Sequence, residues 1–163
     1  MISRRNRKPV YAGAVVTVVT TGVFLALPYI LPVDEIRTLI WQWTGEYPMG
    51  NPFTVLVMFG GATGGVIAGY LTGRKWDANM TNGIYAAVIG LVALYVLYVL
   101  VNIVYWTGLL GQYPPPIYNI LIFPLIYFLP LSATHFLGGM AGGVAGGWIA
   151  SFSSGDRTST DPE

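Results

Sequence analysis

The chain has 163 residues, of which 54% are hydrophobic and only 9% are charged, and its mean hydropathy is +0.60. A soluble domain usually carries about 25% charged residues, and no Asp, Glu, Lys or Arg occurs here between Asp77 and Asp156, so the composition indicates a membrane protein. No cysteine is present, which excludes disulfides, thiolate metal sites and cysteine nucleophiles.

The first apolar segment runs from Val10 to Pro32 and follows four basic residues: Arg4, Arg5, Arg7 and Lys8. About 20 apolar residues cross the hydrocarbon core of a bilayer, so this segment is long enough to span. A cleaved signal peptide is the alternative, but no small-x-small cleavage site follows the segment. The sequence favours an uncleaved signal-anchor helix.

Residues 33–51 follow, with Ile36, Leu39, Ile40 and Trp43 at helical spacing. This pattern predicts a short amphipathic helix at the membrane interface, with its tryptophans at headgroup depth.

Two further spans are predicted, from Pro52 to Gly73 and from Gly83 to Thr107. The second of these closes with Tyr105 and Trp106, an aromatic pair typical of the interface.

Residues 108–130 carry a run of three prolines and the further proline Pro124, and their apolar stretches are short. We expect a re-entrant or interfacial element there, on the outer side, rather than a fifth span. The fourth span is then Leu131 to Phe152, and residues 153–163 form a polar tail that we expect to be disordered. Residues 1–163 thus form a single membrane domain.

The basic residues predict the orientation of the chain, because cytoplasmic loops are enriched in Lys and Arg. With four spans, the inner side holds Arg4, Arg5, Arg7, Lys8, Arg74, Lys75 and Arg157, and the outer side holds Arg37. We therefore expect a multi-pass protein of the cell membrane with both termini in the cytoplasm.

An internal repeat is visible at an offset of 78 residues. It pairs Gly60, Gly61, Gly64, Gly65 and Gly69 with Gly138, Gly139, Gly142, Gly143 and Gly147, Val66 with Val144, Tyr70 with Trp148, and Pro52 with Pro130. The pattern predicts an all-α fold of four transmembrane helices built as a tandem duplicated helical hairpin (residues 9–76 and 83–152), with an outer interfacial or re-entrant element in each half. The alternative is convergence, since glycine-rich helices resemble one another by composition.

The repeated glycines form ridges along the two helices, because residues four apart share a helix face. The ridges predicted to pack helices together are Gly61, Gly65 and Gly69, and Gly139, Gly143 and Gly147. Small residues at this spacing let helix backbones approach closely in lipid. Three partners are open for the two glycine helices: each other, the spans between them, or another copy.

Two polar residues, Asn102 and His135, are predicted to lie at similar depth inside adjacent spans. Intramembrane polar residues are functional candidates, but a structural hydrogen bond between the two is the favoured interpretation, and a ligand or proton-relay role is the alternative. His135 is the only histidine, so a metal site lacks its other ligands. Ser132, three residues before it, has no orienting acid or nucleophile motif for protease chemistry.

The segment from Gly65 to Gly73 (Gly-Val-Ile-Ala-Gly-Tyr-Leu-Thr-Gly) resembles a glycine-helix block in small, uncharacterised membrane proteins of halophilic archaea. That family has no assigned activity, so the resemblance implies a location and a class of organism. The long segment of residues 108–130 departs from the compact family pattern.

The sequence thus favours a non-enzymatic scaffold or complex subunit without cofactors, whose partners are the lipid bilayer and either its own copies or another membrane protein. The alternative is a small channel or transporter with a path between the two repeats. No basic surface supports nucleic-acid binding.

Overall fold

The computed structural model describes residues 7–45, 56–57, 59–73 and 76–153. Every regular element among them is helical: α1 (Arg7–Ile30), α2 (Val33–Thr44), α4 (Gly60–Thr72), α5 (Trp76–Val104) and α6 (Phe123–Ser153), with π-helical turns at Tyr105–Leu109 and Tyr118–Ile122. The predicted disordered tail lies outside the described residues, apart from Ser153, the last residue of α6.

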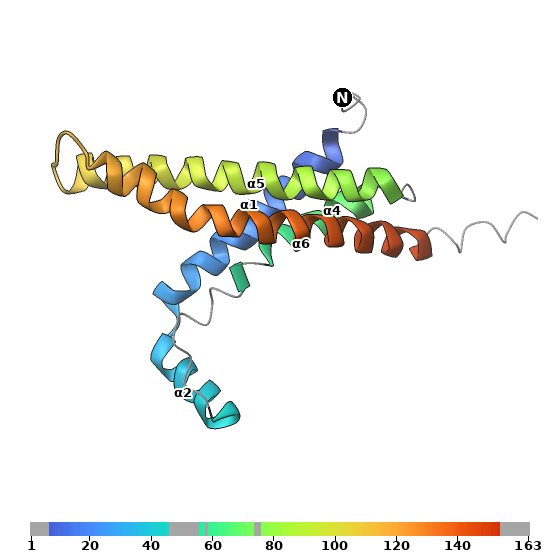
Figure 1. The fold of residues 1–163 in the computed structure, drawn as a ribbon, viewed down its shortest axis with the longest axis horizontal. Helices are drawn as coiled ribbons and strands as arrows, with labels where there is room; N and C mark the ends of the chain where they lie inside the picture. The colour runs from blue at the N-terminus through green and yellow to red at the C-terminus, as the bar shows by residue number, and fades with distance from the viewer. Residues whose placement is uncertain (1–6, 46–55, 58, 74–75, 154–163) are drawn as a thin grey trace, which may run out of the picture.

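Four of these helices pack together in a bundle. The central helix α4 contacts α1, α5 and α6, and α5 also contacts α1 and α6 (Figure 1). Gly13 of α1 lies beside Ala68 while Thr21 lies beside Gly60, so α1 and α4 are antiparallel. Residue pairs of the same kind show that α1 and α5 are parallel, as are α4 and α6. The start of α1, the end of α4 and the end of α6 therefore share one end of the molecule.

The helix lengths indicate a membrane protein. Arg7–Ile30 and Asp77–Leu109, with 24 and 33 residues, are both long and apolar enough to cross a bilayer. The helical segments Tyr118–Ile126 and Phe128–Ser153, which meet at 45°, would make a third span if taken together. The fold is thus all-α, with two or three helices of membrane-spanning length.

The predicted second span is described only in part, because residues 52–55 and 58 lie outside the described residues. Its described portion, α4, has 13 residues, which gives a length of about 20 Å at 1.5 Å per residue, short of the roughly 30 Å of a hydrocarbon core. The four-span arrangement therefore stays a prediction.

The predicted start of the fourth span needs correction, whereas the re-entrant or interfacial element at residues 108–130 stays a prediction. The fourth helix begins at Phe123 rather than Leu131, and a π-helical turn precedes it. The first part of this helical run lies against α5, where the hydroxyl of Tyr95 donates to the carbonyl of Leu121 at 2.9 Å and the ring of Tyr95 meets that of Phe128 at 5.2 Å. Pro124 is the second residue of α6 but follows the π-helical turn Tyr118–Ile122 without a break, so the helical run lacks one backbone hydrogen bond there. Pro130 lies inside α6, close to the 45° bend, as expected of a residue that removes one helical hydrogen bond.

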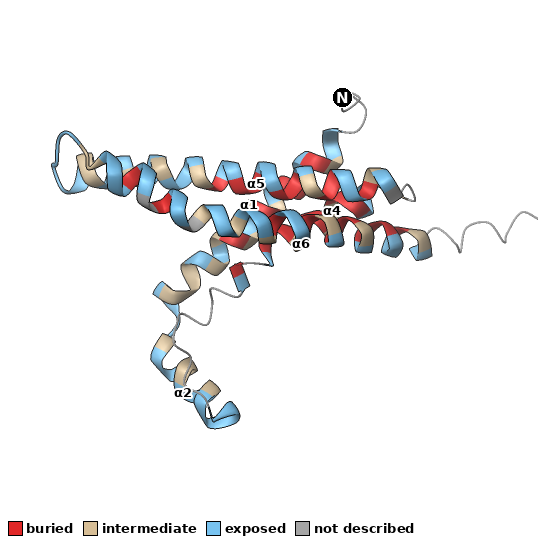
Figure 2. Ribbon diagram, viewed as in Figure 1, coloured by how far each residue is buried: buried red, intermediate tan, exposed pale blue. Residues whose placement is uncertain are grey.

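Buried residues follow the lines along which the four helices meet, whereas α2 and the far halves of α5 and α6 are largely exposed (Figure 2). The exposed side chains there are mostly apolar, such as Leu100, Leu109 and Leu129 at 55%, 77% and 62% exposure. Such surfaces suit contact with lipid rather than water.

Candidate functional site

The helix-packing glycines of α4 lie at backbone contacts with α6. A Cβ added to Gly61 or Gly65 would lie 2.6 Å from the carbonyl oxygen of His135 or 2.5 Å from that of Gly139. A Cβ on Gly69 would collide with the backbone of Gly143. No flexible side chain could yield at these contacts, so the ridge of Gly61, Gly65 and Gly69 must remain free of side chains.

The other ridge of α4 faces α1. Side chains added at Gly60 and Gly64 would occupy the positions of the Thr21 and Thr17 hydroxyls. Both faces of α4 are thus used inside one chain, one against α6 and the other against α1. Sequence reasoning placed Gly60 and Gly64 on a ridge but did not identify the threonines that fill it, although Gly13, Thr17 and Thr21 share a face of α1 at spacing four.

The glycine ridges of α6 are divided in the same manner. Gly139, Gly143 and Gly147 face α5, where they meet Gly83, Ala87 and Asn79. The neighbouring ridge, Gly138, Gly142 and Gly146, faces the backbone of α4 from Ala62 to Tyr70. The glycines of both helices therefore pack the four helices of one chain against one another.

The pairing of α4 with α6 differs from the pairing that the repeat implies. At the offset of 78, a pseudo-symmetric pair would set Gly61 beside Gly139 and Gly65 beside Gly143. The structure sets Gly65 beside Gly139 and Gly69 beside Gly143, so the two helices are displaced by four residues, or about 6 Å along the helix axis.

His135 is fully buried among α1, α4 and α6. Its Nδ1 lies 2.9 Å from the carbonyl oxygen of Leu131, which can only accept, so Nδ1 carries the proton. In the neutral ring Nε2 is then the acceptor for the hydroxyl of Thr21, 3.2 Å away. Thr21 also has no exposed surface, so the bond joins α1 and α6 deep inside the bundle.

The predicted pair of His135 and Asn102 does not form. The amide of Asn102 donates to the carbonyl of Tyr98 in its own helix, at 2.9 Å. Gly139 packs beside Gly83 and Ala87, and Tyr95 beside Phe128, so His135 lies level with α5 residues well before Asn102. The prediction was wrong because α6 begins earlier than the proline content suggested, which moves Asn102 into the far half of the α5–α6 hairpin.

A second polar cluster ties α4 to α5 near the shared end. Asn79 and Asn82, 2% and 4% exposed, donate to the carbonyl of Gly73 at 2.6 Å and to the hydroxyl of Thr72 at 2.8 Å. Asn79 thereby caps the last turn of α4, where carbonyls lack helical partners. Sequence reasoning missed this cluster, although two asparagines at spacing three near the start of a long apolar helix were a visible signal.

Two buried polar atoms have no hydrogen-bond partner among the described residues: Oγ1 of Thr17 and Oδ1 of Asn79. The Thr17 hydroxyl fills the space above Gly64, so close packing explains its position. Ser132 donates to the carbonyl of Leu129 and is exposed, which separates it from the buried His135. No group of three potential metal-binding side chains occurs within the described residues.

This architecture defines an all-helical protein with membrane-length helices and a core of glycine, alanine and other apolar residues, together with a few buried hydroxyl, amide and imidazole groups. Residues 49–149 match the model of a family of unknown function, DUF5518, and the chain belongs to that family. No curated protein and no solved structure matches the chain. The resemblance of Gly65–Gly73 to membrane proteins of halophilic archaea stays a prediction.

Proposed function

We propose that the protein is a non-enzymatic structural component of the cell membrane, acting as a scaffold or as a subunit of a membrane complex. The observation that supports this function best is the contact between α4 and α6, where a Cβ on Gly65 would lie 2.5 Å from the carbonyl oxygen of Gly139. Helices in such contact form a rigid body whose outer surface is apolar, which suits a protein that holds other membrane components in place.

The contacts also weigh against the alternative of a channel or transporter with a path between the two repeats. Such a path would run between α4 and α6, which meet backbone to backbone at Gly61, Gly65 and Gly69. Water or an ion needs a polar space of at least its own size. The buried imidazole of His135 is already bonded on both nitrogens, to Thr21 and to Leu131, which suits a structural role.

We further propose that the chain crosses the membrane four times as a duplicated hairpin, with both termini in the cytoplasm. The helix directions support it, because α1 and α5 run one way and α4 and α6 run the other. The displacement of α4 on α6 by one turn means that the copies, if duplicated, have since adopted different contacts. Arg7 and Lys8 at the start of α1 are exposed, as inner-side basic residues would be.

The proposal also places any partner on the outer faces of the bundle. Since both glycine ridges of α4 are used within one chain, they are not available to a second copy or another protein. The exposed apolar faces of α5 and α6, including Leu100 and Leu129, are the surfaces open to such contact.

Affinity purification in a mild detergent tests this function. A stable hetero-complex or homo-oligomer is expected, which Leu100→Ser or Leu129→Ser weakens while the thermal stability of the isolated chain is kept. Reconstitution into liposomes provides the second readout, with no ion flux above that of empty liposomes. A lone chain that conducts ions or moves a solute would replace the scaffold with the transport function.

A further inference from the structure

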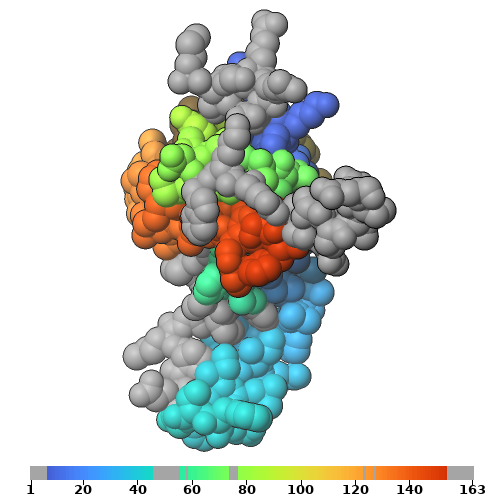
Figure 3. Space-filling view, turned by 90° about the vertical axis from the view of Figure 1, so that its right-hand side faces the viewer, coloured from blue at the N-terminus to red at the C-terminus, as the bar shows by residue number. Residues whose placement is uncertain are grey.

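Helix α2 stands apart from the bundle. It projects beyond the packed helices in the ribbon and in the space-filling view (Figure 3). None of its 12 residues is buried, and no other described element packs along it. Isolated helices shorter than about 12 to 15 residues are marginal in water, so α2 needs a surface to stabilise it.

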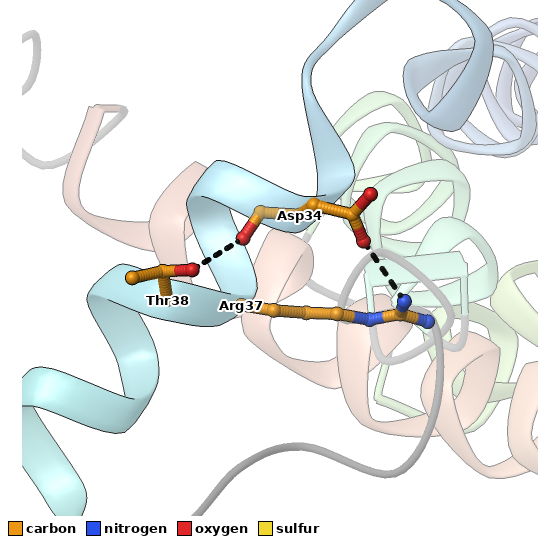
Figure 4. Close-up of polar contacts among 3 residues, drawn as sticks. All are labelled: Asp34, Arg37 and Thr38. Carbon is orange, nitrogen blue, oxygen red and sulfur yellow. Dashed lines mark hydrogen bonds and ion pairs between the residues drawn. The ribbon is translucent and has the colours of Figure 1, made fainter.

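The ends of α2 are well defined by local interactions. Asp34 and Glu35 in its first turn complement the helix dipole. The guanidinium of Arg37 pairs with Asp34 at 3.3 Å, and the hydroxyl of Thr38 donates to the carbonyl of Asp34 at 2.8 Å (Figure 4). Gly45, in the left-handed region at φ 74°, closes the helix by donating its N–H to Trp41. Such exposed contacts contribute only tenths of a kcal/mol each, so they fix the bounds of α2 without accounting for its stability.

Most residues of α2 fall on one of two faces, one apolar and one mainly polar. At about 100° per residue, one face carries only apolar side chains, and the opposite face is polar except for Trp41. The apolar face is Val33, Ile36, Leu39, Ile40 and Trp43, and the polar face is Asp34, Glu35, Thr38 and Gln42. Leu39 and Trp43 are 54% and 88% exposed, so the apolar face is open.

We propose that the membrane surface itself covers this face, and that α2 lies along the leaflet at which α1 ends. The connection from α1 supports a lipid occupant. Helix α1 is of membrane-spanning length and ends at Ile30, and α2 begins at Val33. Three Cα–Cα steps of about 3.8 Å keep the first residue of α2 within about 11 Å of the end of α1. The inference rests on the membrane location of α1 and not on the scaffold function.

The charge of α2 narrows the kind of lipid it fits. Two acids, Asp34 and Glu35, and one base, Arg37, give the helix a net charge of −1. Helices recruited by anionic lipids carry clusters of Lys and Arg on the polar face, and α2 has none. The contact of α2 with the membrane is therefore apolar, among neutral or zwitterionic headgroups. Salt should not change the membrane binding of α2.

Site-directed spin labelling of the full chain in phosphatidylcholine liposomes tests the proposal, since the sequence contains no native cysteine. Labels replacing Leu39 and Trp43 are compared with labels replacing Thr38 and Gln42 as matched controls. The apolar-face labels should be accessible to oxygen, which partitions into lipid, and shielded from a water-soluble nickel chelate. The control labels should show the reverse, and neither pattern should change at high salt.

Two results would overturn the proposal. If all four labels were accessible to the nickel chelate, α2 would lie in water. If the labels at Leu39 and Trp43 were shielded from both reagents, protein would cover the face, either a second copy or another part of the chain. A further variant, Leu39→Asp, should release α2 from the surface and expose a label at Trp43 to the chelate while leaving the thermal unfolding of the bundle unchanged.

Discussion

The bond between Thr21 and His135 joins residues 114 apart in the chain, on two helices that otherwise scarcely meet. Polar contacts of this kind inside membranes contribute about 0.6 kcal/mol on average and at most about 1.7 kcal/mol. We expect a double-mutant cycle of Thr21→Val and His135→Leu, read by thermal unfolding in detergent, to give a coupling energy in that range.

The matched control for this cycle is Asn102→Leu combined with His135→Leu. Asn102 bonds only within α5 in the structure, so the two substitutions should be additive. His135→Gln keeps a donor and an acceptor, and we expect it to be milder than His135→Leu. A folded and assembled His135→Gln protein that had lost its function would instead assign the imidazole a chemical role, because only imidazole among the two changes charge near neutral pH.

The glycine contacts make a second prediction at the scale of single residues. Gly65→Ala and Gly143→Ala should destabilise the chain, because each added Cβ would meet backbone atoms of the facing helix. The matched control is Gly22→Ala in α1, where the nearest atom, Cδ1 of Leu94, is 3.9 Å from the added Cβ. There the higher helix propensity of alanine should make the change neutral or stabilising, by up to about 1 kcal/mol.

Thermal unfolding of the three variants in the same detergent checks this ordering. Val66→Leu offers a comparison with greater added bulk, and it should cost less than Gly65→Leu because Val66 already projects a side chain. Equal stability of Gly65→Ala and Gly22→Ala would show that the α4–α6 backbones are further apart than described.

At the scale of elements, the long hairpin of α5 and α6 is the main departure from the sequence-based expectation. We predict that cysteines replacing Tyr95 and Phe128, whose rings lie 5.2 Å apart, can be joined by a short bifunctional thiol reagent. Cysteines at Tyr105 and Phe128 should not be joined, since Tyr105 lies ten residues, or about 15 Å, further along the helical run. Joining of the second pair but not the first would contradict the pairing of Tyr95 with Phe128.

Some helices could be predicted from the sequence and others could not, for physical reasons. Helix α1 and the amphipathic α2 follow from hydrophobic length and periodicity, which are local properties. The start of α6 could not be predicted in this way. The sequence alone does not distinguish a proline that a helix accommodates from a proline that bends or ends it. Whether such a proline ends the helix depends on whether α5 is long enough to pack against the residues before residue 130.

The candidate site shows the same division. The glycine ridges could be predicted because spacing four is visible in the chain, and so could a buried role for His135. Their partners could not be predicted, because a register between helices is a tertiary property. The repeat offset predicted one register between α4 and α6, and the structure has another. The opposite side of α4 is filled by Thr17 and Thr21 at Gly64 and Gly60.

At the scale of the whole molecule, the helix directions place both ends of the described chain on one side. If that side is the cytoplasm, cysteine replacing Ser153 should resist impermeant thiol reagents in intact cells, and cysteine replacing Thr44 should react. The basis is the distribution of Lys and Arg, since Arg7 and Lys8 begin α1 while Arg37 lies in α2. Reaction at Ser153 but not at Thr44 would invert the orientation.

The close fit of α1 against α4 also means that the chain can be divided into two fragments that reassociate. Thr17 and Thr21 fill spaces at Gly64 and Gly60, so the helices recognise each other by shape. Helices that are each stable in lipid can associate after insertion without being joined. Two fragments divided at Met49, produced together, should therefore reassemble into a bundle that co-purifies. Gly64→Leu in the second fragment should abolish co-purification of the two fragments.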